Sequence, residues 1–356
     1  MISKPASTPS WSICSERISE RLLALVLICF LASGCGGGDA AEQLLADYRS
    51  RVERVLDAED VVGDELVLEP WPRARERHLE IPLQRIDLID FLRLNDCGLG
   101  ALAGMRASSL GRVMTPPERL RYELRFVREG ERCLSGLESE DDAELQAFLA
   151  DALAVKETVF GAVAFNATFG SDVLARHHAL DVEALDPSAL AGAGDIAIEA
   201  VHGLAERAAL NGDADREDWN APWAALDASR YGGRLHRSLV LLERDLDAVA
   251  GLVEQSESLC PLGTPSEAAR ILGNVFQNVY AARVQPYMAG IESGANRFDA
   301  ALDRLAAVQG VMVPEALAPT PVQRALDAMR QARDRHTRAW QAFHEACGLR
   351  VGTRPD

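Results

Sequence analysis

The feature that most constrains the fold is a helix-start signal that recurs along the chain. Thr115-Pro116-Pro117-Glu118, Thr264-Pro265-Ser266-Glu267 and Thr320-Pro321-Val322-Gln323 each combine a capping side chain, a proline at the first helical position and a Glu or Gln at the third. Asp39-Ala40-Ala41-Glu42 has the same capping spacing without the proline. A capping side chain accepts hydrogen bonds from N–H groups that have no partner within the helix. We therefore expect helices to begin at these four places.

Apolar residues repeat at helical spacing along most of the chain, which indicates amphipathic helices. The clearest stripe runs about five turns and consists of Leu235, Leu239, Leu242, Leu246, Val249 and Val253. No useful alternating segment is present except residues 65–68. Pro286 is expected to kink or break the helix around it, and Gly348 to end the last helix with Leu349 as its apolar partner. These patterns predict an all-α fold, an elongated multi-helix bundle.

An apolar run near the N-terminus predicts export. Residues 22–31 are ten consecutive apolar residues that follow several basic ones. Such a run is too short to span a bilayer and has the length of a signal-peptide core. Leu31-Ala32-Ser33-Gly34-Cys35 then resembles a bacterial lipobox, in which the cysteine becomes the lipidated first residue of the mature protein. The alternative is a buried N-terminal helix with an incidental cysteine.

Lipidation of Cys35 predicts a stable membrane anchor, because several acyl chains together hold a protein on a bilayer. Gly36 follows the cysteine, and not the aspartate typical of inner-membrane retention, so the pattern implies the periplasmic face of an outer membrane. The expected organisation is a signal peptide over 1–34, a lipidated cysteine and glycine tether over 35–38, and a helical domain over 39–356. The three tether glycines span at most roughly 10 Å, so we expect the body close to the membrane.

Export changes how the other cysteines are interpreted. The mature chain keeps Cys97, Cys133, Cys260 and Cys347, and an even number in an oxidising compartment favours disulfides. Four cysteines allow three pairings, and we favour Cys97 with Cys133 and Cys260 with Cys347 because these are neighbours in sequence. A zinc site is the alternative, but no CxxC motif or suitably spaced histidine supports it.

One basic region stands out in a chain whose formal net charge is -17. Between Trp71 and Cys133 arginines outnumber acidic residues by three. Arg106, Ser109 and Arg112 lie just before a helix start, where guanidinium groups and free N–H groups could bind a carboxylate or phosphate. The alternative is that these arginines pair with the chain's own carboxylates and fix a disulfide-closed loop.

Other kinds of chemistry have little support in the sequence. No GxSxG motif occurs and no base is signalled for Ser108 or Ser109, so we assign no catalytic residue. His177 and His178 point about 100° apart on a helix, and His336 and His344 on one face are too few for a metal site. We therefore expect no metal and no cofactor. The net negative charge argues against a nucleic-acid partner.

The lipobox, the Cys97 segment and Ser109-Leu110-Gly111-Arg112-Val113 together resemble an uncharacterised family of proteobacterial lipoproteins, domain-of-unknown-function family 3080. The resemblance covers most of the mature chain and is most specific over residues 92–122. It implies periplasmic exposure. It implies no activity, cofactor or catalytic residue.

These observations favour a non-enzymatic outer-membrane lipoprotein that binds an envelope protein or glycan through its Arg-rich region. One alternative is an envelope hydrolase or transferase acting on peptidoglycan or lipid, with Arg106 and Arg112 holding an anionic substrate near Asp96 or Glu123. A deep pocket joining these residues would favour the enzyme, and a flat or filled surface would favour binding. Another alternative is a small-ligand carrier with a cavity between its helices.

Overall fold

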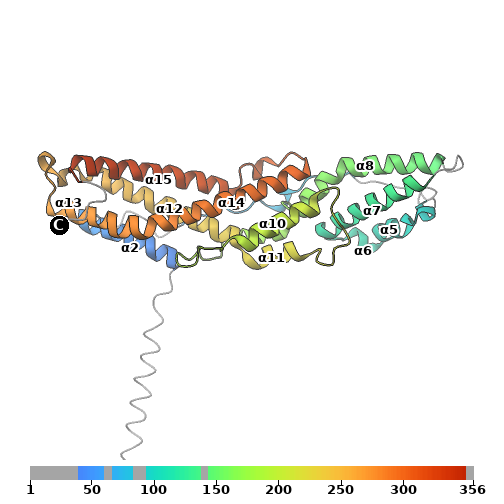
Figure 1. Ribbon diagram of the computed structural model, residues 1–356, viewed down its shortest axis with the longest axis horizontal. Coiled ribbons are helices and arrows are strands. Elements are labelled where there is room, and N and C mark those ends of the chain that lie inside the picture. Colours follow the sequence, from blue (N-terminus) through green and yellow to red (C-terminus); the bar gives the residue numbers. More distant parts are fainter. Residues whose placement is uncertain (1–38, 60–65, 83–93, 138–142, 350–356) are drawn as a thin grey trace, which may run out of the picture. The chain divides into compact units, whose positions relative to one another are not determined.

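A computed structural model of the chain describes residues 39–59, 66–82, 94–137 and 143–349 (Figure 1). The predicted signal peptide over 1–34 and the predicted lipidation site Cys35 lie outside these residues. The described helices are α2 (Ala40–Leu56), α3 (Ala74–Arg77), η1 (Leu94–Cys97), α5 (Leu99–Ala107), α6 (Ser109–Arg112), α7 (Pro116–Gly136), α8 (Ala143–Ala167), α9 (Asp172–His177), α10 (Asp195–Ala208), α11 (Ala221–Ser229), α12 (Tyr231–Glu254), η3 (Ser256–Leu259), η4 (Pro261–Gly263), α13 (Glu267–Val275), η5 (Phe276–Val284), α14 (Gln285–Gln309), η6 (Glu315–Leu317) and α15 (Pro321–Ala346).

The all-α prediction is confirmed: the described segments form a multi-helix bundle and contain no strand. Residues 66–68, the described part of the one possible strand, are not in a sheet, and residue 65 lies outside the described residues. Within the described part of the chain, none of the helices combines the length and the apolar character needed to cross a bilayer.

The helices enclose two hydrophobic cores of very different size. The main core lies between α2 and the helices from α9 to α15, and its largest helix–helix interface joins α12 to α15, drawn in yellow and red in Figure 1. The small core consists of Leu94, Leu99, Ala103, Tyr122, Phe126, Val127, Leu149 and Leu153. We call residues 94–137 and 143–156 the small-core region and the other described residues the main-core region. Helices α7 and α8 contribute buried residues to both cores.

Three of the four predicted helix starts are confirmed, at Ala40, Pro116 and Pro321. The fourth helix begins two residues later than predicted, at Glu267, and Ser266 caps it by accepting a hydrogen bond from the Ala269 N–H at 3.1 Å. The signal is displaced because Thr264 serves as the C-terminal cap of the short η4 turn, and the Ser266 N–H donates to the Leu259 carbonyl at 3.0 Å, so the helix begins only after Ser266.

The chain remains helical through Pro286, where we expected a kink or break. The π-helical segment η5 ends at Val284, two residues before the proline, and the Gln285 N–H donates to the carbonyl five residues earlier, on Tyr280. A π-turn widens the helix locally and leaves room for a residue that has no N–H to donate. The predicted C-terminal cap is confirmed: Gly348 has φ 62°, and the Leu349 N–H donates to the His344 carbonyl at 2.9 Å.

Candidate functional site

The predicted anion-binding segment lies at the junction of α5 and α6. Ser108 caps α6: its Oγ accepts a hydrogen bond from the Gly111 N–H at 3.0 Å and donates to the Met105 carbonyl at 2.7 Å. Arg106 Nη1 donates to the Gly111 carbonyl at 2.6 Å. A side chain at Gly111 would place a Cβ 2.2 Å from the Met105 carbonyl oxygen. Arg106 therefore holds the junction together, and glycine is needed because the backbones approach so closely.

The rest of this segment is exposed. Ser109 and Arg112 lie on the surface, and Leu110 and Val113 beside them are 79% and 74% exposed. Met105 is also exposed. We call these five residues the α5–α6 surface. The sequence from 97 to 117 contains no acidic residue, so this surface combines apolar side chains with positive charge in an otherwise acidic protein.

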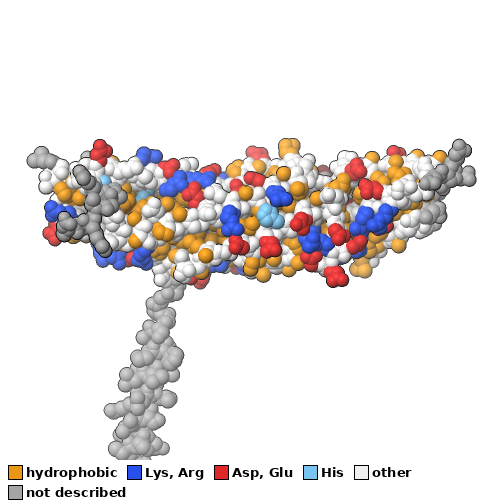
Figure 2. Space-filling view, in the orientation of Figure 1, with side chains coloured by type: hydrophobic (Ala, Val, Ile, Leu, Met, Phe, Trp, Pro, Cys, Tyr) orange, Lys and Arg blue, Asp and Glu red, His pale blue; other side chains and the backbone are white. Residues whose placement is uncertain are grey.

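Most of the other described arginines between Trp71 and Cys133 pair within the protein. Arg125 and Arg128 of α7 both bond to Asp215 in the loop after α10. Further pairs and hydrogen bonds join Arg77 to Asp172, Arg119 to Glu123, Arg121 to the Ala214 carbonyl and Arg132 to Glu129. On the face shown in Figure 2, basic and acidic side chains lie next to one another in several places. The intramolecular alternative therefore describes these arginines.

Glu123, one of the acids considered for an enzyme, lies inside the small-core region. Its side chain is 4% exposed and forms an ion pair with Lys156 at 2.7 Å. The Lys156 ammonium also lies 5.3 Å and 5.1 Å from the ring centroids of Tyr122 and Phe126. Lys156 is the one lysine among the described residues. The side chain of Asp96, the other acid considered, lies outside the described part of the chain.

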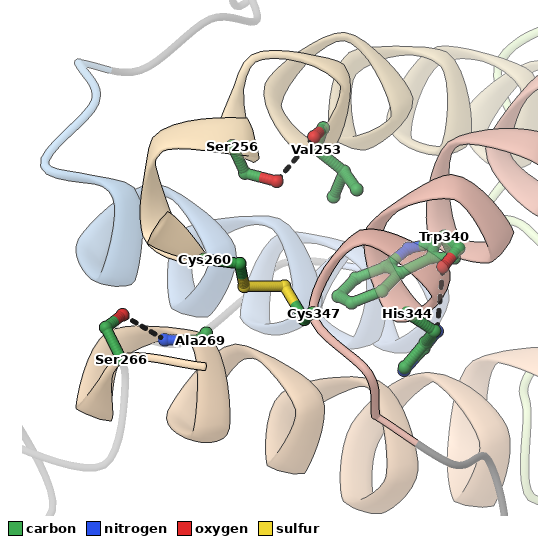
Figure 3. The surroundings of a disulfide bond; sticks show 8 residues. All are labelled: Val253, Ser256, Cys260, Ser266, Ala269, Trp340, His344 and Cys347. Carbon is green, nitrogen blue, oxygen red and sulfur yellow. Dashed lines mark hydrogen bonds between the residues drawn. A yellow bond between two sulfur atoms is a disulfide. The ribbon is translucent and has the colours of Figure 1, made fainter. Parts of the chain in front are cut away.

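Both predicted disulfides are present. Cys97 and Cys133 join η1 to α7 with a Cα–Cα distance of 5.4 Å. Cys260 and Cys347 join the turns after α12 to the end of α15 with a Cα–Cα distance of 5.1 Å, beside Trp340 and His344 (Figure 3). Cysteines paired in this way have no thiolates to offer, so the zinc alternative fails for all four.

His336 is a packing residue of the main core: its Nε2 is hydrogen-bonded, while its Nδ1 has no hydrogen-bond partner in the described part of the chain. His336 and Tyr48 are fully buried, and the two hydrogen-bond at 2.8 Å between Nε2 and the hydroxyl, to which Trp340 Nε1 donates at 3.0 Å. Burial lowers the pKa of His336 to about 3. This Tyr–His–Trp cluster resembles a reactive site in composition, but no substrate can reach it. The sequence feature that pointed to this cluster was the position of His336 and His344 on one face of a helix.

His177 and His178 also lie in the main core. His177 Nδ1 bonds to the Leu226 carbonyl at 2.8 Å, and its Nε2 accepts from the Gly232 N–H at 3.0 Å. Burial lowers the pKa of His177 to about 4, so the ring is neutral at physiological pH. Within the part of the chain that the structure describes, no three His, Cys, Asp or Glu side chains are placed to hold a metal ion.

Concave surface occurs elsewhere. A groove of about 450 Å³ lies between α14, residues 313–320 and α15, and we call it the α14–α15 groove. A second groove, of about 830 Å³, lies between α2, residues 186–190 and the start of α14. A hollow of about 300 Å³ lies beside Cys97 and is lined by Arg125, Arg128 and Asp215. Arg106, Ser109 and Arg112 line none of these three, so they do not converge on any of them.

The comparisons with known proteins show a family and no activity. The family model for DUF3080, described as a protein of unknown function, matches residues 45–351. No curated protein and no solved structure matches the chain. The match covers the small core, nearly all of the main core, both disulfides and the α5–α6 surface. The chain therefore belongs to the DUF3080 family of proteins of unknown function.

Proposed function

We propose that this protein is a lipid-anchored lipoprotein of the outer membrane, facing the periplasm, whose helical body binds an envelope protein or glycan. The anchor is Cys35 in the lipobox-like segment 31–35, and the binding region is the α5–α6 surface. The two disulfides support export to an oxidising compartment.

The proposal rests on the α5–α6 surface because large apolar side chains, which folded proteins usually bury, are exposed to solvent there. Leu110 and Val113 are more than two-thirds exposed, in a segment that has no acidic residue to pair with Arg112. Contiguous exposed apolar groups mark interaction surfaces, and arginine is among the residues that most often contribute strongly to binding energy. Binding is favoured over hydrolase or transferase chemistry because Glu123 is buried against Lys156, away from solvent.

Site-specific crosslinking in intact cells tests the binding surface. A photoreactive amino acid at Leu110 should form an adduct with a protein band or with the purified cell-wall fraction. The same amino acid at Ile196, which is 66% exposed on α10, is the matched control and should form none. Arg112→Ala should reduce the Leu110 adduct several-fold. Arg132→Ala, which removes another exposed arginine of the same region, should leave it unchanged.

Equal adducts at Leu110 and Ile196, or an adduct that ignores Arg112→Ala, would overturn the proposed surface. The anchor is tested separately by labelling cells with an alkyne-bearing fatty acid. The wild-type protein should take up the label and fractionate with the outer membrane, while Cys35→Ser should do neither. Unlabelled wild-type protein would reject the anchor without bearing on the α5–α6 surface.

A further inference from the structure

The α14–α15 groove has an apolar floor. Leu302, Leu317, Leu326 and Phe169 line it and are buried in the main core beneath. None of the residues that line the groove belongs to the α5–α6 surface. The inference about this groove therefore does not rest on the proposed partner surface or on the proposed anchor.

The rim of the groove is acidic. Asp299 and Asp303 come from one face of α14, four residues apart, and Asp327 comes from α15. Arg330 is the one basic residue among those that line the groove. Its guanidinium nitrogens bond to Glu292 at 2.9 Å, to Asn296 at 2.7 Å and to Asp327 at 3.3 Å. The charge of Arg330 is thus shared with two carboxylates, and the rim keeps a net negative charge.

The capping box of α15 positions Asp299. The Thr320 N–H donates to Gln323 Oε1 at 2.7 Å, and Gln323 Nε2 donates to Asp299 Oδ1 at 2.5 Å. Among the described residues, the Asp299 carboxylate makes no other side-chain hydrogen bond and the Asp303 carboxylate makes none. Burial, with the nearby charge of Asp303, raises the pKa of the Asp299 carboxyl. The groove therefore holds a fixed, half-buried carboxylate whose charge is poorly compensated.

We propose that the α14–α15 groove binds a small organic cation, with a primary ammonium group between Asp299 and Asp303 and an aliphatic stem on Leu302, Leu317 and Leu326. The ammonium supplies the missing counter-charge, and the stem covers the apolar floor. A bare metal ion fits less well, because no group of three potential ligands among the described residues is placed to hold one.

Binding of simple amphiphiles to the body tests this inference. Residues 39–356 suit the experiment because every buried core residue of the described chain lies between Ala41 and Cys347. The probes are n-hexylamine, n-hexanol and hexanoate at pH 7, measured by ligand-detected NMR and titration calorimetry. We expect hexylammonium to bind at least ten-fold more tightly than the alcohol or the carboxylate, which share its stem.

Asp299→Asn combined with Asp303→Asn should weaken hexylammonium binding at least ten-fold, and Asp303→Asn alone, at an exposed position, should weaken it less. Asp334→Asn, on α15 outside the groove, is the matched control and should have no effect. Equal binding of hexanol and hexylammonium, or retention of binding in the double variant, would overturn the inference. Competition by millimolar MgCl2 would also overturn it, by showing a metal site.

Discussion

The two cores of this protein are stabilised in different ways. The main core is extensive, and its buried polar groups, such as the Tyr48–His336–Trp340 cluster, are embedded among many apolar side chains. The small core has eight buried residues, closed by the Cys97–Cys133 disulfide and by the Lys156–Glu123 ion pair. A small apolar core buries too little surface to offset much chain entropy, so covalent and ionic links become important there.

The largest expected difference between the two regions is in their stability at acid pH. The main-core region contains all the buried histidines among the described residues, whereas residues 94–156 contain no histidine. The pKa of His177 is about 4 and that of His336 about 3, so the unfolded chain binds more protons than the folded chain below pH 6.5. The contribution of these two histidines to the free energy of unfolding is therefore fully present above pH 6.5 and falls as the pH drops towards 4. At pH 4.5 each of these two histidines costs about 2.5 kcal/mol.

Urea unfolding at pH 7 and pH 4.5, followed by tryptophan fluorescence, measures this effect. The described tryptophans, Trp71, Trp219, Trp223 and Trp340, all report on the main-core region. His336→Gln keeps a hydrogen-bond acceptor for Tyr48 but cannot titrate, so it should make the pH dependence shallower. Equal stability at both pH values would show that buried histidines do not distinguish the two regions.

Loss of the disulfides should affect the two regions differently. Replacing Cys97 and Cys133 by serine opens a loop whose ends are 36 residues apart. Replacing Cys260 and Cys347 by serine opens a loop whose ends are 87 residues apart. Loop entropy gives about 4 kcal/mol for the first disulfide and about 4.5 kcal/mol for the second. Because its core is small, the region of residues 94–137 should unfold locally without its disulfide, while the main core remains folded.

Hydrogen exchange followed by mass spectrometry separates these outcomes. In the first variant, peptides from α7 should lose protection and peptides from α12 should keep it. In the second variant, α12 and α15 should lose protection together, since that disulfide lies at the end of their interface. Full protection of α7 without Cys97 and Cys133 would contradict the view that the small core depends on its covalent link.

The buried ion pair is the next largest contribution to the small-core region. Lys156→Met leaves Glu123 buried with only the more distant Arg119, at 3.8 Å, and should cost about 3 kcal/mol. Lys156→Met combined with Glu123→Gln removes both charges and should recover most of that loss. Arg132→Met, which breaks an exposed pair with Glu129, should cost at most about 0.5 kcal/mol in the same thermal melts. A double variant no more stable than Lys156→Met would reject this assignment.

Local chemistry explains what the sequence could predict of this fold. Caps, prolines and apolar periodicity act over a few residues, so the helices and three of their four starts follow from the sequence. The disulfides were predictable because each joins neighbouring cysteines. The η4 turn that displaces the start of α13, and the π-turn that accommodates Pro286, depend on packing that short-range patterns do not encode.

The sites were less predictable, because distant segments form them. The α14–α15 groove combines α14, residues 313–320 and α15, and nothing in the local sequence marks Asp299 among so many carboxylates. From residue type alone, Arg106 and Arg112 were equal candidates for binding an anion. The structure shows that Arg106 bonds to the Gly111 carbonyl while Arg112 is exposed.

The smallest predicted effect compares the same helix-start signal in the two regions. In the main-core region, Thr320 Oγ1 accepts from the Gln323 N–H at 3.2 Å and completes a capping box. In the small-core region, the Thr115 side chain makes no capping hydrogen bond. Thermal melts should therefore show a loss of about 1 kcal/mol for Thr320→Ala and only a few tenths for Thr115→Ala. Equal losses of stability would mean that both threonines stabilise their helix starts through their backbone conformation and not through a side-chain hydrogen bond.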